Sequence, residues 1–195
     1  MSAVTLKTGE RFNLNDAVGT DPLRIEILWA LADTSQKPDV DASVFVCKIA
    51  NGAKTIISDE YFVFYNNKVS PDGAVTHQGD TVPGTDGAPD KQVVRIDLAK
   101  LSRDAQELRF FVTIHRSEER GQTFADVPTL GVRLYNDTTG AELARYDVEQ
   151  ADGDLSSVLM ATIKRETPDA PCWFEAAGEG SQHDLGELVD EHMSN

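Results

Sequence analysis

The chain has 195 residues, of which 40% are hydrophobic, so it is long enough to form one large domain whose core needs no disulfide or metal. Its 33 acidic and 18 basic residues give a formal net charge of -15. This excess of carboxylates repels nucleic acid and anionic membranes and so argues against both as partners, whereas it suits cations or basic proteins; it also promotes solubility by itself.

Alternating hydrophobicity predicts a half-buried strand early in the chain. In residues 23–31, Leu23, Ile25, Ile27 and Trp29 fall on one face of an extended chain, and Arg24 falls on the other. Comparable apolar or alternating runs predict further strands at residues 42–49, 61–65, 93–98, 108–114, 130–134, 145–147 and 172–177. Helical signal is sparse, and we expect only a turn or two within residues 98–107 and a short C-terminal helix within residues 183–192.

Turn sequences separate the predicted strands. They include Asn51-Gly52, Pro71-Asp72-Gly73, Pro83-Gly84 and Asp86-Gly87. Many short strands joined by such turns predict an antiparallel β-sandwich or barrel. We expect this domain to occupy residues 1–180, followed by a polar C-terminal tail at residues 181–195.

The two cysteines and the N-terminal segment predict a cytoplasmic protein. Cys47 and Cys172 lie far apart, form no Cys-x-x-Cys motif, and are expected to be reduced; Cys47 sits in an apolar run typical of a buried strand. Residues 1–11 lack the apolar core of a signal peptide, and no run reaches transmembrane length, so we expect no membrane insertion. Trp29 and Trp173 also lie in apolar patterns and are expected in the core.

Acidic and amide side chains concentrate in the loops between residues 39 and 90. Asp39 and Asp41 are two residues apart at the start of a predicted strand, so both carboxylates should face the same side. Calcium takes six to eight oxygen ligands from carboxylates, amides and backbone carbonyls, which such loops can present. The candidate ligands are Asp39, Asp41, Asn66, Asn67, Asp72, Asp80, Asp86 and Asp90. The spacing is not that of an EF-hand, and Asp, Asn and Gly are also ordinary turn residues, so the residue types leave a metal site and plain loops both open.

Motifs for the common enzyme classes are absent from the sequence. The chain contains no His-Glu-x-x-His, no Gly-x-Ser-x-Gly and no P-loop. His77 lies beside the acidic loops and could support a cation, although a local hydrogen bond is the simpler interpretation; His115 is expected to be an exposed strand-end residue. A carboxylate-based hydrolase would need two carboxyl groups with separated pKa values facing one cleft, and the mixture of carboxylate, amide and glycine oxygens favours an ion instead.

Several segments, taken in order, resemble the TerD family of tellurium-resistance and stress-response proteins. These are DVDAS at residues 39–43, SDEYFVFYNNK at 58–68, SPDG at 70–73, HQGD at 77–80 and ELARYD at 142–147. The resemblance runs from about Leu6 to Gly180 and covers most of the chain.

The resemblance implies an all-β, antiparallel β-sandwich with calcium-binding acidic loops at one end, and a role in resistance to tellurite and other stresses without catalytic activity. Other proteins of the resistance system are the implied partners. The positions that match the family's calcium ligands are Asp39, Asp41, Asn66, Asn67, Asp80 and Asp90, with Asp72 nearby.

The sequence departs from the family pattern in the loop at residues 84–91, which has fewer carboxylates, and at Arg116, which stands where relatives have an aspartate. The alternative to a calcium-binding interaction module is therefore a metal-free paralogue whose loops bind a protein partner.

Overall fold

The computed structural model describes residues 2–31, 38–79, 81–85, 88–148 and 154–193. The strands are β1 (Val4–Leu6), β2 (Arg11–Asn13), β3 (Leu23–Ala30), β4 (Val40–Ala50), β5 (Ala53–Ile56), β6 (Phe62–Val63), β7 (Val75–His77), β8 (Asp90–Ile96), β9 (Glu107–Ile114), β10 (Thr129–Asn136), β11 (Glu142–Asp147), β12 (Ser157–Lys164) and β13 (Trp173–Ser181). The α-helices are α1 (Leu14–Val18), α2 (Ser117–Arg120) and α3 (Leu185–His192), and short 3-10 helices occur at Asp59–Tyr61, Leu98–Lys100 and Phe124–Asp126.

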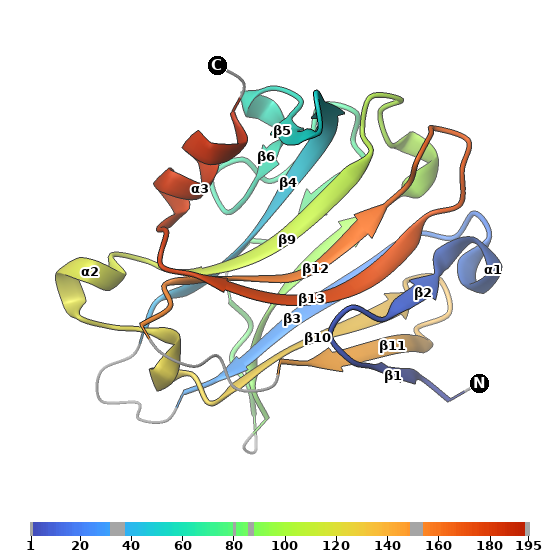
Figure 1. Cartoon of the computed structure of the whole chain (residues 1–195). Coiled ribbons are helices and arrows are strands. Elements are labelled where there is room, and N and C mark those ends of the chain that lie inside the picture. Colours follow the sequence, from blue (N-terminus) through green and yellow to red (C-terminus); the bar gives the residue numbers. More distant parts are fainter. Residues whose placement is uncertain (1, 32–37, 80, 86–87, 149–153, 194–195) are drawn as a thin grey trace.

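The strands form two sheets that pack face to face, which confirms the predicted sandwich (Figure 1). Sheet A has the order β1-β11-β10-β3-β8-β7, and sheet B has the order β2-β13-β12-β9-β4-β5, with β6 paired to β4. The pairing is antiparallel except between β1 and β11, which run parallel.

The core lies between the sheets and follows the predicted alternation. Leu23, Ile25, Ile27 and Trp29 of β3 are at most 2% exposed, while Arg24 between them is half-buried on the outer face. Cys47 is fully buried, as predicted. These inward-facing side chains hold the two sheets together because each removes apolar surface from water on association of the sheets.

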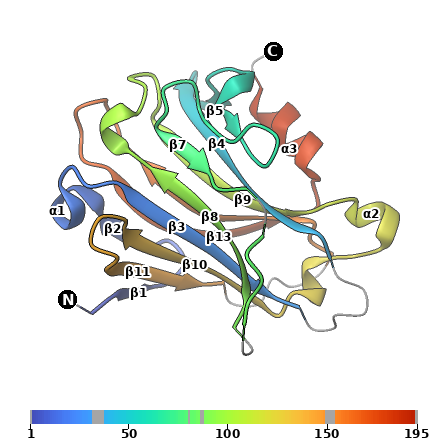
Figure 2. The same cartoon turned by 180° about the vertical axis from the view of Figure 1, so that it is seen from behind.

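The C-terminal helix α3 covers part of the outer face of sheet B. Leu188 of α3 joins a second apolar cluster with Phe45 of β4, Phe111 of β9 and Leu159 of β12, and both views of the molecule place α3 beside β4 and β5 (Figures 1 and 2). All residues of β9 are buried, although alternation alone would predict one solvated face: Phe111 lies in the cluster with α3, and Glu107 pairs with Arg109 at 2.7 Å. A capping box between Asp184 and Glu187 starts the helix, which confirms the predicted C-terminal helix.

Two local predictions were wrong. Residues 61–65 form no continuous strand: the Asn67 side chain donates hydrogen bonds to the carbonyls of Glu60 (2.9 Å) and Phe62 (2.7 Å), and this closes a tight turn after the two-residue β6. Trp173 is 38% exposed and not in the core. It lies at the start of β13 opposite Asn13 of the short edge strand β2, where no further layer covers it.

Strand pairing decides which loops meet at each end of the sandwich. Trp29 of β3 pairs with Asp90 of β8, and Val40 of β4 pairs with Ile114 of β9, so the end of β3, the starts of β4 and β8 and the end of β9 lie at one end of the molecule. We call this the β4-start end. The loop between β8 and β9, together with the turn at Asp72, lies at the opposite end.

Arg165 provides a test of the fold at that opposite end. Its guanidinium is buried and donates hydrogen bonds to the carbonyls of Ala105 (2.8 Å), Pro168 (3.2 Å), Leu101 (3.5 Å) and Ser102. We expect Arg165→Met to lower the free energy of unfolding by about 3 kcal/mol in urea denaturation, because several buried carbonyls lose a charged donor.

The matched control is Arg103→Met. Arg103 is 75% exposed and pairs only with exposed Asp169 among the described residues, so its loss should cost less than about 1 kcal/mol. Equal losses of unfolding free energy in the two variants would show that the hydrogen bonds of Arg165 to the neighbouring loop carbonyls do not stabilise the fold.

Candidate metal centre

Asp39 and Asp41 lie at the β4-start end, as the sequence predicted. The Asp39 carbonyl accepts a hydrogen bond from the backbone N–H of His115 (2.8 Å), which ties the segment before β4 to the end of β9. Asp41 pairs with Thr113 of β9 inside the ladder. The Asp39 side chain is exposed and that of Asp41 is half-buried, so the first carboxylate faces water and the second is partly withdrawn from it.

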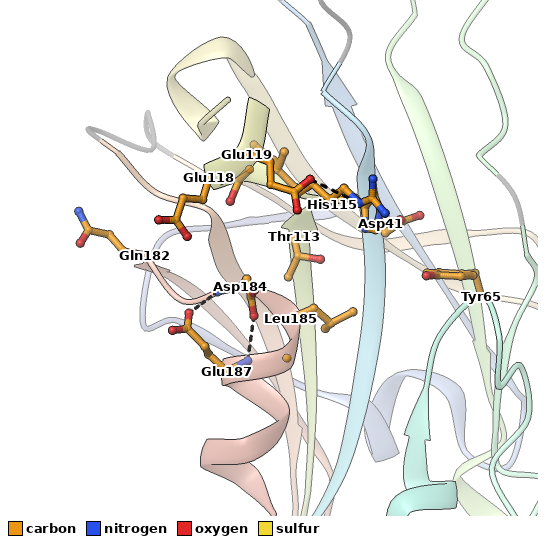
Figure 3. Close-up of a pocket in the computed structure, with 14 residues that line it drawn as sticks. Asp41, Tyr65, Thr113, His115, Glu118, Glu119, Gln182, Asp184, Leu185 and Glu187 are labelled. Atoms are coloured by element: carbon orange, nitrogen blue, oxygen red, sulfur yellow. Dashed lines mark hydrogen bonds and ion pairs between the residues drawn. The ribbon is translucent and has the colours of Figure 1, made fainter. Parts of the chain in front are cut away.

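Three hollows adjoin these carboxylates. The first has a volume of about 470 Å³ and is lined by Asp39, Asp41, Tyr65, Thr81, Gln92 and His115. The second, of about 360 Å³, is lined by Trp29, Leu31, Pro38, Asp39, Val40, Thr81, Asp90 and Arg120. The third, of about 340 Å³, lies between Asp41, helix α2 and the start of α3; Figure 3 shows Asp41 and His115 on one side of it and Asp184 and Glu187 on another. Because Asp39 lines the first two and Asp41 the first and third, the carboxylate pair stands where the hollows meet.

The side chain of Gln92 connects the carboxylates to sheet A. Its amide Nε2 donates to Asp41 Oδ1 (3.0 Å) and to Thr81 Oγ1 (3.2 Å). Its Oε1 accepts from the backbone N–H of Ala42 (2.7 Å) and lies 3.2 Å from His77 Nε2. Gln92 is 2% exposed, so this amide forms a buried polar network between the two sheets.

His77 is neutral in this network. The backbone N–H of Gly79 donates to His77 Nδ1 (3.0 Å), so Nδ1 carries no proton and Nε2 carries it toward Gln92. Burial lowers the pKa of the His77 imidazole below its ordinary value, against the opposing effects of the Gln92 hydrogen bond and the Asp41 charge. The predicted local hydrogen bond of His77 is therefore confirmed, and His115 is exposed at the end of β9, as expected.

The Asp41 carboxylate carries a negative charge with little compensation. Burial raises the pKa of the Asp41 carboxyl, and the neighbouring Asp39 charge adds to this effect, while the hydrogen bond from Gln92 opposes it. Among the described residues, no Lys or Arg lies within ion-pair distance of Asp39, Asp41 or Asp90. A cation placed between these carboxylates would remove their mutual repulsion, so the donor set fits a metal that prefers oxygen.

The other predicted ligands are distributed unevenly. Asp90 lines the second hollow, and its Oδ1 accepts from the backbone N–H of Gly84 (2.8 Å). Asn66 is exposed in the turn next to Tyr65, which lines the first hollow, whereas the amide nitrogen of Asn67 is used to close that turn. Asp90 therefore shares a hollow with Asp39, and Asn66 lies one residue from Tyr65, which lines the hollow of the carboxylate pair.

The structure does not bring Asp72 to this group. Asp72 lies at the opposite end of the sandwich, where Oδ1 accepts from Ser70 Oγ (2.6 Å) and the Ala74 N–H (2.9 Å), and Oδ2 accepts from the Ser102 N–H (2.8 Å). Asp72 stabilises a turn and connects it to the loop before β9. The prediction that it lies near the other candidate ligands was therefore wrong. Asp80 and Asp86, also candidate ligands, lie outside the described residues.

The described residues alone do not complete a metal-binding cluster. Within the described ranges, no three His, Cys, Asp or Glu side chains converge in an arrangement that could hold a metal ion. Asp39 and Asp41 line one hollow together with the hydroxyl groups of Thr81 and Tyr65, and Asp90 lines the adjoining one. Thr81, Gln92 and Tyr65 were not predicted. Gln92 had a usable signal, because it shares the inward face of β8 with Val94 and Ile96 and is the one polar residue of the three.

No helix among the described residues is both long and apolar enough to span a bilayer.

Comparison with known proteins gives several related sequences. The chain is 31% identical to the tellurium resistance protein TerD of Serratia marcescens and 32% identical to that of an Alcaligenes species, each over 99% of this chain and 98% of the relative. It is 30% identical to general stress protein 16U of Bacillus subtilis over 79% of this chain and 77% of that protein.

The fold also matches that of a solved relative. The crystal structure of a homologue of telluride resistance protein (TerD) from Streptomyces coelicolor superposes with a TM-score of 0.65 at 21% identity, covering 90% of this chain and all of that one. The family model described as the TerD domain matches residues 1–192, which includes α3. The chain therefore belongs to the TerD family.

Proposed function

We propose that this protein is a calcium-binding, non-enzymatic interaction module that acts in tellurium resistance and the stress response. The observation that carries the proposal is the pair Asp39 and Asp41, which converge at one end of the sandwich without a cationic partner among the described residues. Two neighbouring carboxylates of this kind repel each other, and a bound divalent cation would offset that repulsion.

Calcium suits this site better than a softer or smaller ion. We assign Asp39, Asp41, Asn66 and Asp90 as ligands from the described residues, with Thr81 and backbone carbonyls as further oxygen donors. These groups come from separate loops and strand ends, and calcium tolerates irregular coordination by six to eight oxygens. Both cysteines are buried and lie in unrelated parts of the chain, so direct capture of tellurium by thiolates has little support.

Binding would change the surface that a partner meets. A cation at the β4-start end would reduce the local negative charge and draw the separate loops together, so the surface offered to another protein would depend on calcium. The related resistance and stress proteins make another protein of the same system the partner that we propose. The free, buried thiols Cys47 and Cys172 support a reducing compartment, the cytoplasm.

A metal-free docking surface is the second candidate. Arg120 lines the second hollow and Arg116 lines the third, and both bring positive charge toward the carboxylates. In this alternative the loops would bind a protein partner without calcium. Calcium titration separates the two candidates, since only the first requires the ion.

Calcium should raise the thermal stability of the protein. An ion that binds only the native state adds about 2.7 kcal/mol when its free concentration is one hundred times Kd, which for a chain of this size raises Tm by about 5 to 10 °C. Thermal melts in chelator and in excess calcium measure the difference. Superimposable melts would remove the calcium proposal and favour the metal-free docking surface.

Calcium should bind more tightly than magnesium. Magnesium requires near-ideal octahedral geometry and gives up its water reluctantly, whereas the candidate ligands are spread over several loops. Competition titration should show calcium displaced only by a large excess of magnesium. Displacement by equal concentrations would indicate a diffuse acidic patch in place of a coordinated site.

Asp41→Asn should weaken calcium binding by about tenfold or more in isothermal titration, because it removes a ligand charge while keeping the side-chain shape. In chelator the same variant should be at least as stable as wild type at neutral pH. The pKa of Asp41 is raised in the folded state, so its ionised form opposes folding at pH values above that pKa.

The matched control is Asp104→Asn, which removes one charge from an exposed position at the opposite end. It should leave calcium affinity almost unchanged. Equal, small losses in the two variants would mean that net charge, and not coordination, attracts the ion.

A further inference from the structure

Strand β4 has an incomplete neighbour on the side away from β9. β5 pairs with Cys47 to Ala50, and β6 pairs only with Val44 and Phe45. Among the described residues, the backbone N–H of Ala42 therefore has no partner strand, and a buried N–H without a partner would destabilise the fold. Gln92, which belongs to the opposite sheet, supplies the missing acceptor through Oε1 at 2.7 Å.

This acceptor role fixes the orientation of the Gln92 amide. The Ala42 N–H can only donate, and the neutral His77 ring also presents a donor, so the atom facing both must be the oxygen Oε1. The NH₂ group must then face Asp41 and Thr81, to which it donates. All four hydrogen-bonding positions of the amide are occupied. Rotation by a half-turn would turn the NH₂ group toward the Ala42 and His77 donors and the oxygen toward the Asp41 carboxylate, and would break those three contacts.

The donor that faces Asp41 is electrically neutral. It holds Oδ1 of the carboxylate at 3.0 Å but leaves the negative charge in place, whereas an Arg or Lys at the same position would cancel the charge. Among the described residues, Asp41 Oδ2 has no hydrogen-bond partner and stays available on the side of the hollow. A carboxylate that is oriented without being neutralised is prepared to bind a cation.

We propose that Gln92 is the positioning residue of the candidate metal centre: fixed by Ala42 and His77, it orients the Asp41 carboxylate for the cation. The inference rests on the proposed calcium function and adds to it a residue that is not itself a ligand. Loss of a group that orients a metal ligand typically lowers metal affinity by about 10- to 100-fold.

Gln106 provides a matched comparison within the same molecule. Its Oε1 accepts a hydrogen bond from the backbone N–H of Ile49 (2.9 Å), near the other end of β4, and its Nε2 donates to the carbonyl of Glu166 (3.4 Å). It therefore supports a β4 backbone N–H as Gln92 does, but it hydrogen-bonds to no carboxylate in the part of the chain that the structure describes. If Gln92 served only to satisfy the β4 backbone, substitution of either glutamine would have the same effect on calcium affinity.

The test compares Gln92→Met with Gln106→Met by isothermal titration with calcium and by thermal melts in chelator. We expect both variants to lose stability in chelator, and only Gln92→Met to weaken calcium binding, by about tenfold or more. His77→Phe should weaken calcium binding to a smaller degree while Gln92 is retained, because it removes one of the two donors that hold the amide. This second variant keeps the inference testable if Gln92→Met fails to fold.

The inference would be overturned if Gln92→Met and His77→Phe bound calcium as tightly as Gln106→Met. The calcium proposal itself would still stand. An absence of binding heat with the wild-type protein, where melts also show no calcium effect, would instead remove the proposed function and the positioning role together.

Discussion

The break in strand pairing beside the start of β4 is the constraint on which the candidate site depends. β4 has β9 along one side, but at Ala42 no described strand lies on its other side, and the backbone donor there is satisfied by a side chain from the opposite sheet. A sandwich normally associates through apolar side chains alone. Here one buried amide crosses the interface, and the same amide contacts a carboxylate at the molecular surface. Core formation and site geometry are therefore coupled through Gln92.

The distribution of charge separates this end of the molecule from the outer face of sheet A. On that face carboxylates are paired: Glu26 with Lys91 at 2.9 Å, and Asp147 with Arg133 at 2.7 Å. At the β4-start end, the described residues give Asp41 a neutral hydrogen-bond donor, Gln92, and no ion pair with Lys or Arg, although Arg116 lines the same hollow. The net charge of -15 is thus not spread evenly as a solubilising coat, since one part of it is concentrated where loops from both sheets converge.

Sequence patterns predicted the strands that alternate and failed where other forces set the structure. β3 was predicted because its two faces differ, whereas β12, which is buried on both faces, shows no such contrast and was missed. Periodicity tells which face a residue occupies but not which end of the sandwich a loop joins. Asp72 was therefore grouped with Asp39 and Asp41, although strand pairing carries it to the far end. Gln92 was missed because its role depends on a partner some fifty positions away, at Ala42.

Helix α3 has a consequence for any shortened form of the chain. It shields Phe45, Phe111 and Leu159 on the outside of sheet B, and among the described residues its own side chains reach that sheet through apolar and aromatic contacts alone. A protease cut or a stop codon just after Ser181 would leave all the strands intact and uncover an aromatic surface. Such a fragment would be folded yet self-associating, and its poor solubility would be easily mistaken for a defect in the sandwich.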